Sequence, residues 1–399
     1  MKKILLISVI FAALLTACDD TVIETIEGNT IRFDNAFVSQ PTRATDITID
    51  NLTNFYVHAW MSNSDNQTAC IFNSVEVTKS ANDWTYGGGG RYWFADKKYE
   101  FLAFSPLNAQ YTLDDTHASF IYYNNGAKAQ KSAGAQDDLI VSKVDRVTTQ
   151  KQLSTDDILP VSLHFHHLLS RVVFNFVNDF TTPDVKLRIE DIKLTGIANS
   201  ATFEFATLDN EIEFPEDGYT PYSDSYVDSI GSWLVSPEAN NHNGEAVGIL
   251  FPDILSTTPN SRTASAVEIT TANYQGTTGD DSNSAAYSSK DMKILKAVGN
   301  ALSEQVYIIP ETIGYEQYRL TFTVTMFQGN DEHPIQIGVF NHSVALNAMT
   351  FEQGKSYKLT AKFNSTNVNP ATELKPIEFT VSVTPWGEDI EGDVSFPGE

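Results

Sequence analysis

Residues 171–180 read RVVFNFVNDF, and this stretch decides the fold class. Its apolar residues follow the two-residue period of a β-strand and not the 3.6-residue period of a helix. The same period recurs in residues 53–60, 98–105, 318–327, 355–363 and 377–383. Clusters of Gly, Asn, Asp, Ser and Pro separate these segments, which is typical of antiparallel β-sandwiches. The sequence therefore predicts a mostly β fold. The few helical candidates are residues 289–301 and a single turn within residues 164–170.

The length of the chain predicts two domains. It has 399 residues, and about 150 to 200 residues make one packed unit. The longest polar stretch without an alternating apolar face is 143–157, so we place the boundary there. An N-terminal β-sandwich then covers residues 31–156, and a C-terminal β-sandwich covers residues 157–399. Residues 257–289 are rich in Thr, Ser, Asn, Asp and Gly, which predicts a long surface excursion from the second sandwich.

Composition excludes several classes of function. The chain has 26 Lys and Arg against 51 Asp and Glu, a formal net charge of −25. A nucleic-acid partner, which needs basic counter-charge, is therefore excluded. Two cysteines are too few for a disulfide framework or a multi-cysteine metal site. We expect no metal, no cofactor and no enzymatic activity.

The amino end has the pattern of an export signal. Residues 1–17 contain two lysines and then an apolar run that is too short to span a bilayer. The run ends in Leu-Thr-Ala before Cys18, which resembles a bacterial lipobox, so we expect the Cys18 thiol to be acylated. Asp19 and Asp20 follow, as in a lipoprotein signal for display at the cell surface. The acyl chains would be the only attachment to the membrane. Cys70 then has no intrachain partner, and we expect it to be a small buried hydrophobic residue.

Four groups of residues have a catalytic or ligand-binding interpretation beside a structural one. His164, His166 and His167 resemble a metal cluster, but they also fit a strand with His164 and His166 outward. Residues 87–90 (GGGG) lack the Gly-Lys-Ser/Thr ending of a phosphate loop, which favours a hairpin loop. Acidic pairs such as Asp137 and Asp138 fit turns better than a glycosidase or a calcium loop. The aromatics of residues 219–233 can stack on sugars, or fold back onto the sandwich.

The order of four short motifs resembles the fimbrillin family, the subunits of type V pili of Bacteroides and Porphyromonas relatives. The motifs are the lipobox at Cys18, residues 41–45 (PTRAT), residues 165–172 (FHHLLSRV), and residues 354–357 (GKSY) leading into a last strand that ends at Trp386. The resemblance implies two tandem transthyretin-like β-sandwiches. It also implies export as an outer membrane lipoprotein and removal of the propeptide by an arginine- or lysine-specific protease. The cut would fall between Arg43 and Ala44.

This resemblance gives physical sense to both ends of the chain. The propeptide, residues 18–43, contains a strand-like segment, and its removal would leave a groove with unpaired backbone groups. A strand from the next subunit could fill the groove, as in donor-strand exchange. Residues 388–399 are the candidate donor, because Ile390, Val394 and Phe396 fall on one face. The alternative is a frayed acidic terminus.

Function follows as a hypothesis with one rival of a different class. The first interpretation is a structural fimbrial subunit, stalk or tip, that polymerises with other fimbrial subunits as a homo- or hetero-polymer at the cell surface. A tip subunit would also bind a host protein or a glycan. The rival is a surface-anchored carbohydrate-binding lipoprotein, and a secreted hydrolase has only scattered carboxylates in its favour.

Overall fold

The structure is a computed structural model in which strands are the only regular secondary structure of the described residues. It describes residues 30–38, 47, 51–62, 68–81, 83–95, 97–124, 138–148, 160–181, 185–206, 230–238, 241–243, 246–249, 266–270, 301–329, 335–372 and 376–385. The mostly β fold class is thereby confirmed. No helix in this part of the chain is long and apolar enough to cross a membrane. Most of the helical candidate at residues 289–301 and most of the excursion at 257–289 lie outside the described residues, and Ala301 is the first residue of a strand.

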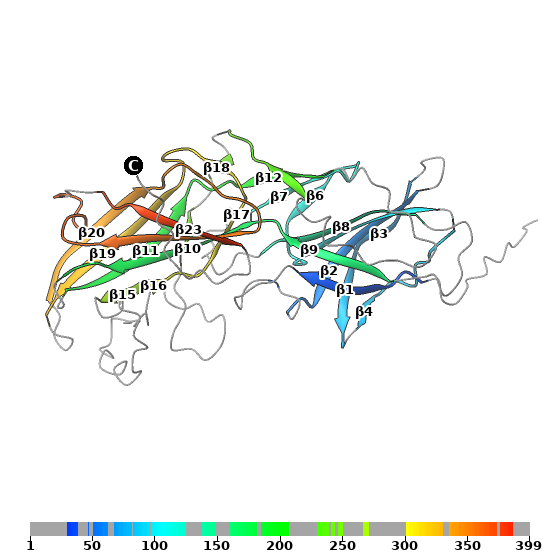
Figure 1. Ribbon diagram of the computed structural model, residues 1–399, viewed down its shortest axis with the longest axis horizontal. Coiled ribbons are helices and arrows are strands. Elements are labelled where there is room, and N and C mark those ends of the chain that lie inside the picture. The colour runs from blue at the N-terminus through cyan, green and yellow to red at the C-terminus, as the bar shows by residue number, and fades with distance from the viewer. Residues whose placement is uncertain are drawn as a thin grey trace, which may run out of the picture.

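The first half of the molecule is a closed barrel of seven strands (Figure 1). In order around the barrel these are β1 (Phe33–Val38), β4 (Asp83–Tyr86), β3 (Thr68–Ser80), β2 (Asn54–Ser62), β5 (Lys98–Ser105), β8 (Ile140–Thr148) and β9 (Val161–His167). Aromatic and β-branched residues alternate inward and fill its interior, with Phe55, Phe72 and Phe101 fully buried.

The second half is a sandwich of two sheets at the other end of the elongated molecule (Figure 1). One sheet contains β16 (Ala301–Leu302), β17 (Val306–Ile308), β10 (Ser170–Asn178), β22 (Lys355–Phe363) and β23 (Phe379–Pro385). The facing sheet contains β14 (Val247–Gly248), β15 (Ala266–Thr270), β11 (Val185–Thr195), β19 (Arg319–Gln328) and β20 (Ile335–Ala345). Their inner faces share one apolar core.

A third sheet joins the two halves. Its strands are β13 (Gly231–Leu234), β12 (Ser200–Phe205), β7 (Ser119–Tyr123) and β6 (Tyr111–Leu113), so it takes strands from both parts of the sequence. Its buried side chains pack on the outer face of the barrel, and Phe120 contacts both Phe104 and Phe203. The short pair β18 (Thr312–Ile313) and β21 (Met349–Thr350) lies beside it.

The predicted boundary after residue 156 lies outside the described residues and stays a prediction. β9 follows that position in the sequence, yet it completes the barrel by pairing with β8 and β1. β10 begins three residues after the end of β9 and belongs to the second half. The helical turn expected within residues 164–170 is wrong, because this segment is the end of β9 and the start of β10.

Candidate functional site

The first site is the seam at which β1 closes the barrel. β1 runs parallel to β9, with Phe33 opposite Val161 and Val38 opposite Phe165. On its other side Phe33 is opposite Trp84 of the antiparallel β4. β1 therefore supplies backbone pairing to two strands that have no other connection to each other in the barrel order.

The residues at the start of β1 are anchored in the barrel core. Ile31 is fully buried and Phe33 is 5% exposed. The Phe33 ring makes edge-to-face contacts with Phe55, Phe72 and Phe101 at centroid distances of 6.1, 5.6 and 6.2 Å. Burial of a side chain of this size contributes about 1.5 to 3 kcal/mol. Loss of β1 would therefore expose both strand edges and apolar surface.

The glycine loop after β4 holds an arginine beside this seam. Arg91 Nη1 donates to carbonyl oxygens of residues 87–89 at 2.9 to 3.5 Å, and its Nε donates to the Ile71 carbonyl at 2.8 Å. The guanidinium also lies 4.9 Å from the Phe72 ring centroid. The Arg91 carbonyl in turn accepts the Ile31 N–H at 2.7 Å. Because carbonyl oxygens face the arginine, these glycines surround a cation and not a phosphate.

A buried pair holds the chain on the carboxyl side of the predicted cut. His167 Nδ1 lies 2.8 Å from Asp138 Oδ2, and both side chains are almost completely shielded from solvent. The same carboxylate oxygen accepts the Ile47 N–H at 3.3 Å. Val38 and Ile47 are therefore the described residues that flank Arg43 and Ala44, and each is bound to the barrel by its backbone.

The site residues predicted from the sequence fall mostly outside this part of the chain. Cys18, Arg43, Ala44, and the three donor residues Ile390, Val394 and Phe396 lie outside the described residues, so their roles stay predictions. No group of three or more metal-ligating side chains occurs among the residues described.

The histidine motif and the second cysteine have different outcomes. His164 and His166 are half-buried while His167 is buried, which confirms the strand interpretation. The expectation for Cys70 is wrong. Cys70 is exposed on β3, and its thiol lies 3.2 Å from the Phe72 carbonyl.

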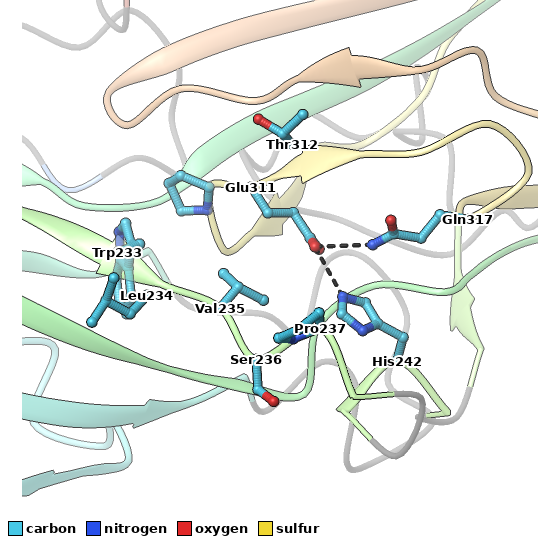
Figure 2. Close-up of a pocket in the computed structure, with 10 residues that line it drawn as sticks. Trp233, Leu234, Val235, Ser236, Pro237, His242, Glu311, Thr312 and Gln317 are labelled. Atoms are coloured by element: carbon cyan, nitrogen blue, oxygen red, sulfur yellow. Dashed lines mark hydrogen bonds and ion pairs between the residues drawn. The ribbon is translucent and has the colours of Figure 1, made fainter.

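A second site is a pocket of about 570 Å³ beside the sheet that joins the two halves (Figure 2). One wall is formed by β13 and the residues after it, and the other comes from residues 310–317. The lining residues are Trp233, Leu234, Val235, Ser236, Pro237, His242, Pro310, Glu311, Thr312 and Gln317. Figure 2 shows the Glu311 side chain pointing between Gln317 and His242.

The centre of this pocket is a carboxylate with three donors. Glu311 Oε2 accepts hydrogen bonds from His242 Nε2 at 2.9 Å and from Gln317 Nε2 at 3.0 Å. Glu311 Oε1 accepts one from the Tyr318 hydroxyl at 2.6 Å. Burial raises the pKa of Tyr318 well above its ordinary value, and the nearby Glu311 charge raises that pKa further.

Trp233 does not offer a free ring to a ligand. Its Nε1 donates to the Leu168 carbonyl at 2.7 Å, and its ring contacts Phe203 at a centroid distance of 5.0 Å and Tyr122 at 6.0 Å. For this aromatic, at the end of residues 219–233, folding back onto the sheet is confirmed. The sequence gives no signal for the pocket, because its walls come from segments about seventy residues apart and lack a motif.

The described part of the protein is built from β-strands, and its first strand, β1, closes the barrel between β4 and β9. A sequence model of the fimbrillin-like family matches residues 42–277, more than half of the chain. The chain belongs to this family, and it is thereby a fimbrial protein of the cell surface, a structural class and not an enzyme class.

Two of the solved structures that align with this chain are described as fimbrial proteins. A fimbrial protein from Bacteroides vulgatus is 16% identical with a TM-score of 0.53, over 90% of this chain and 99% of that chain. A fimbrial assembly protein from Parabacteroides distasonis is 13% identical with a TM-score of 0.32, over 90% of this chain and 100% of that chain. At 16% identity, the similarity to the Bacteroides vulgatus protein shows a common fold and nothing about function. No curated protein sequence matches the chain.

Proposed function

We propose that this chain is a polymerising fimbrial subunit that is exported as an outer membrane lipoprotein, cut after Arg43, and assembled by donor-strand exchange. The observation that carries the proposal is the place of β1. β1 closes the barrel between β4 and β9, and its last residue, Val38, precedes Arg43 by five positions.

A cut after Arg43 separates β1 covalently from the barrel that it completes. Departure of the strand leaves the backbone groups of β9 and β4 unpaired along the seam, which is a template for another strand. It also vacates the positions of Ile31 and Phe33, which are buried. A donor strand from the next subunit restores both the hydrogen bonds and the apolar contacts.

The residues after the cut would stay with the barrel. Ile47 is hydrogen-bonded to Asp138, which is paired with His167 at the end of β9. This attachment lies only four positions after Arg43. The new amino end would therefore remain beside the open seam while the propeptide leaves.

The test is a cut of the purified precursor by an arginine-specific protease. We expect Ala44 as the new amino end, loss of the propeptide fragment, and a ladder of oligomers that resists SDS. Arg43→Gln should remain uncut and monomeric. Arg32→Gln is the matched control, because it changes an exposed arginine of the same segment and should leave cutting and polymerisation intact. A cut wild-type protein that keeps β1 and stays monomeric contradicts the proposal.

Lipidation is a separate part of the proposal and has its own test. Labelled palmitate should be incorporated into the wild-type precursor and not into Cys18→Ala, and the variant should remain in the periplasm. Label in the variant contradicts acylation at Cys18. Stalk and tip roles differ in where antibodies bind: label along the shaft excludes a tip-only role.

A further inference from the structure

The pocket beside β13 contains a charge that the polymerisation proposal does not use. The Glu311 side chain is 5% exposed and forms part of the pocket wall. Its three donors are a phenol, an amide and an imidazole. A hydroxyl and two N–H groups therefore converge on the two oxygens of one carboxyl group in the pocket wall.

No permanently charged side chain of the described residues pairs with this carboxyl group. Among the residues that the structure describes, the one ion-pair partner of Glu311 is His242, and the imidazole is charged only when it is protonated. Lysine and arginine, which are permanently charged near neutral pH, form no ion pair with Glu311 in this part of the chain. A nearly buried negative charge next to a cavity attracts a cation more strongly than an exposed one does.

The opposite wall of the pocket is mostly apolar. Leu234, which is 51% exposed, lines it together with Val235 and Pro237, and Ser236 is its polar member. Figure 2 shows Leu234, Val235 and Pro237 on a different segment from Glu311, which directly precedes β18. A ligand that fits both walls has an apolar stem and a positively charged head, as the side chains of lysine and arginine do.

We propose that this pocket binds a primary amine or a guanidinium group on an apolar stem. The stem packs on Leu234, Val235 and Pro237, and the head forms a charge-assisted hydrogen bond with the Glu311 carboxylate. A neutral sugar fits less well, because sugars bind on open aromatic faces and the Trp233 ring is packed against Phe203 and Tyr122. The group can belong to a lysine or arginine of another protein or to a free alkyl amine.

The test measures binding of small probes to the intact protein by calorimetry or NMR titration. The cationic probes are Nα-acetyl-lysine amide and Nα-acetyl-arginine amide. Nα-acetyl-norleucine amide and Nα-acetyl-citrulline amide are the neutral controls of similar shape. A charge-assisted hydrogen bond predicts that each cationic probe binds roughly tenfold or more tightly than its control. Equal binding of the charged and neutral probes overturns the proposal.

Variants assign the binding to this pocket. Glu311→Gln should lower the affinity for the cationic probes by roughly tenfold, with thermal unfolding measured to show that it is folded. Leu234→Lys places a cation in the cavity and should weaken binding, while Leu234→Glu should strengthen it. Both changes are at an exposed position. Ile337→Lys is the matched control, because Ile337 is 47% exposed on β20 and does not line the pocket.

The outcome with variants is decisive even if Glu311→Gln fails to fold. Opposite effects of the two Leu234 variants, with no effect of Ile337→Lys, support the pocket. Identical effects of Lys and Glu at position 234, or an equal loss with Ile337→Lys, overturn it. A final comparison separates the two sources: 1-pentylamine that competes as well as a lysine-containing pentapeptide indicates a free amine, and a stronger peptide indicates a protein partner.

Discussion

His58 is buried between the barrel and the hairpin that covers it. It is 9% exposed on β2, and its Nε2 lies 2.8 Å from the Tyr111 hydroxyl. Burial, and to a smaller extent the nearby charge of His117, lowers the pKa of His58 to about 4. The folded state therefore keeps this imidazole neutral at a pH at which the unfolded chain protonates it.

This shift predicts a loss of stability in mild acid. The unfolded chain binds the additional proton, so the contribution of His58 is complete above about pH 6.5 and is lost as the pH falls toward about 4. The size of the contribution is at most about 3 kcal/mol. The variant His58→Gln lacks this pH-dependent contribution. The free energy of unfolding of the variant should therefore fall less between pH 7 and pH 4.5 than that of the wild type. Urea unfolding at the two pH values measures it.

His166 is a second histidine that should contribute to the same acid sensitivity. Burial also lowers its pKa to about 4, followed by the charges of His164 and His167. His58→Gln should therefore leave part of the acid sensitivity, and addition of His166→Gln should remove a further part. Identical pH dependence in the wild type and the double variant contradicts the assignment.

Gly196 follows β11 at a position where only glycine fits. Its φ is +88°, and a Cβ atom there would lie 1.9 Å from the Gln317 carbonyl oxygen. We expect Gly196→Ala to lower the free energy of unfolding by roughly 1 to 3 kcal/mol or more, because it adds both backbone strain and a clash with backbone. Gly87→Ala is the control, since a Cβ atom there meets nothing within 4 Å. Equal melting temperatures for the two variants would contradict this prediction, because they would show that the backbone at residues 196 and 317 moves apart without loss of stability.

At the scale of the element, β1 is the strand whose stability matters for assembly. Phe33→Ala should lower the stability of the uncut precursor by about 3 to 5 kcal/mol, because it leaves a cavity among aromatic rings. After cutting at Arg43, the same change should speed release of the propeptide fragment. Arg32→Ala, at an exposed neighbouring side chain, should change neither quantity by much. Mass spectrometry of the native cut protein follows the release.

The strands themselves are readable from sequence, but their partners are not. The alternating segments at 53–60, 98–105 and 318–327 coincide with β2, β5 and β19. The parallel pairing of β1 with β9 joins residues that are far apart in the chain. The periodicity of a single segment predicts that it is a strand, but does not indicate which distant strand it pairs with. The burial expected for Cys70 is wrong because the first residues of β3 are exposed, and apolar neighbours in the sequence do not bury a residue at an exposed strand end.

β10 shows a second limit of pattern reading. All nine of its residues are buried, including Arg171 and Asn175. It lies between β22 on one edge and β16 and β17 on the other, and its faces are covered as well. A polar residue in such a strand is buried with hydrogen-bond partners: Arg171 Nε donates to Ser356 Oγ at 2.8 Å.

At the scale of the whole molecule, the two halves are joined by more than a linker. β7 and β12 pair across the third sheet, with Phe120 opposite Phe203. Their shared core includes Phe104 from the barrel and Tyr307 from β17 of the second half. A subunit in a fibre must transmit tension from its acceptor groove to its donor segment, and a continuous core between the halves is suited to this.

Polymerisation needs a donor as well as the open groove. The described chain ends with β23, which pairs with β22, and residues 388–399 follow this strand in the sequence. In the donor-strand proposal, Ile390, Val394 and Phe396 would fall on one face of an extended segment, because they stand at alternate positions of the sequence, and each would contribute roughly 1.5 to 3 kcal/mol if it is fully buried in a neighbour. If the groove is already formed, the acceptor loses little conformational entropy on binding, so most of this free energy contributes to affinity.

Deletion of residues 388–399 should therefore separate donor from acceptor function. We expect the truncated protein to melt at the same temperature as the full chain and to be cut at Arg43, yet to form no polymer alone. Because its groove is intact, it should still accept one donor, so that adding it to wild-type subunits shortens the SDS-resistant ladder in proportion to its concentration. A full-length chain with Ser at 390, 394 and 396 is the matched control for the apolar anchors and should behave like the deletion. Normal polymerisation of the truncated protein after the cut would show that the donor strand lies elsewhere in the chain.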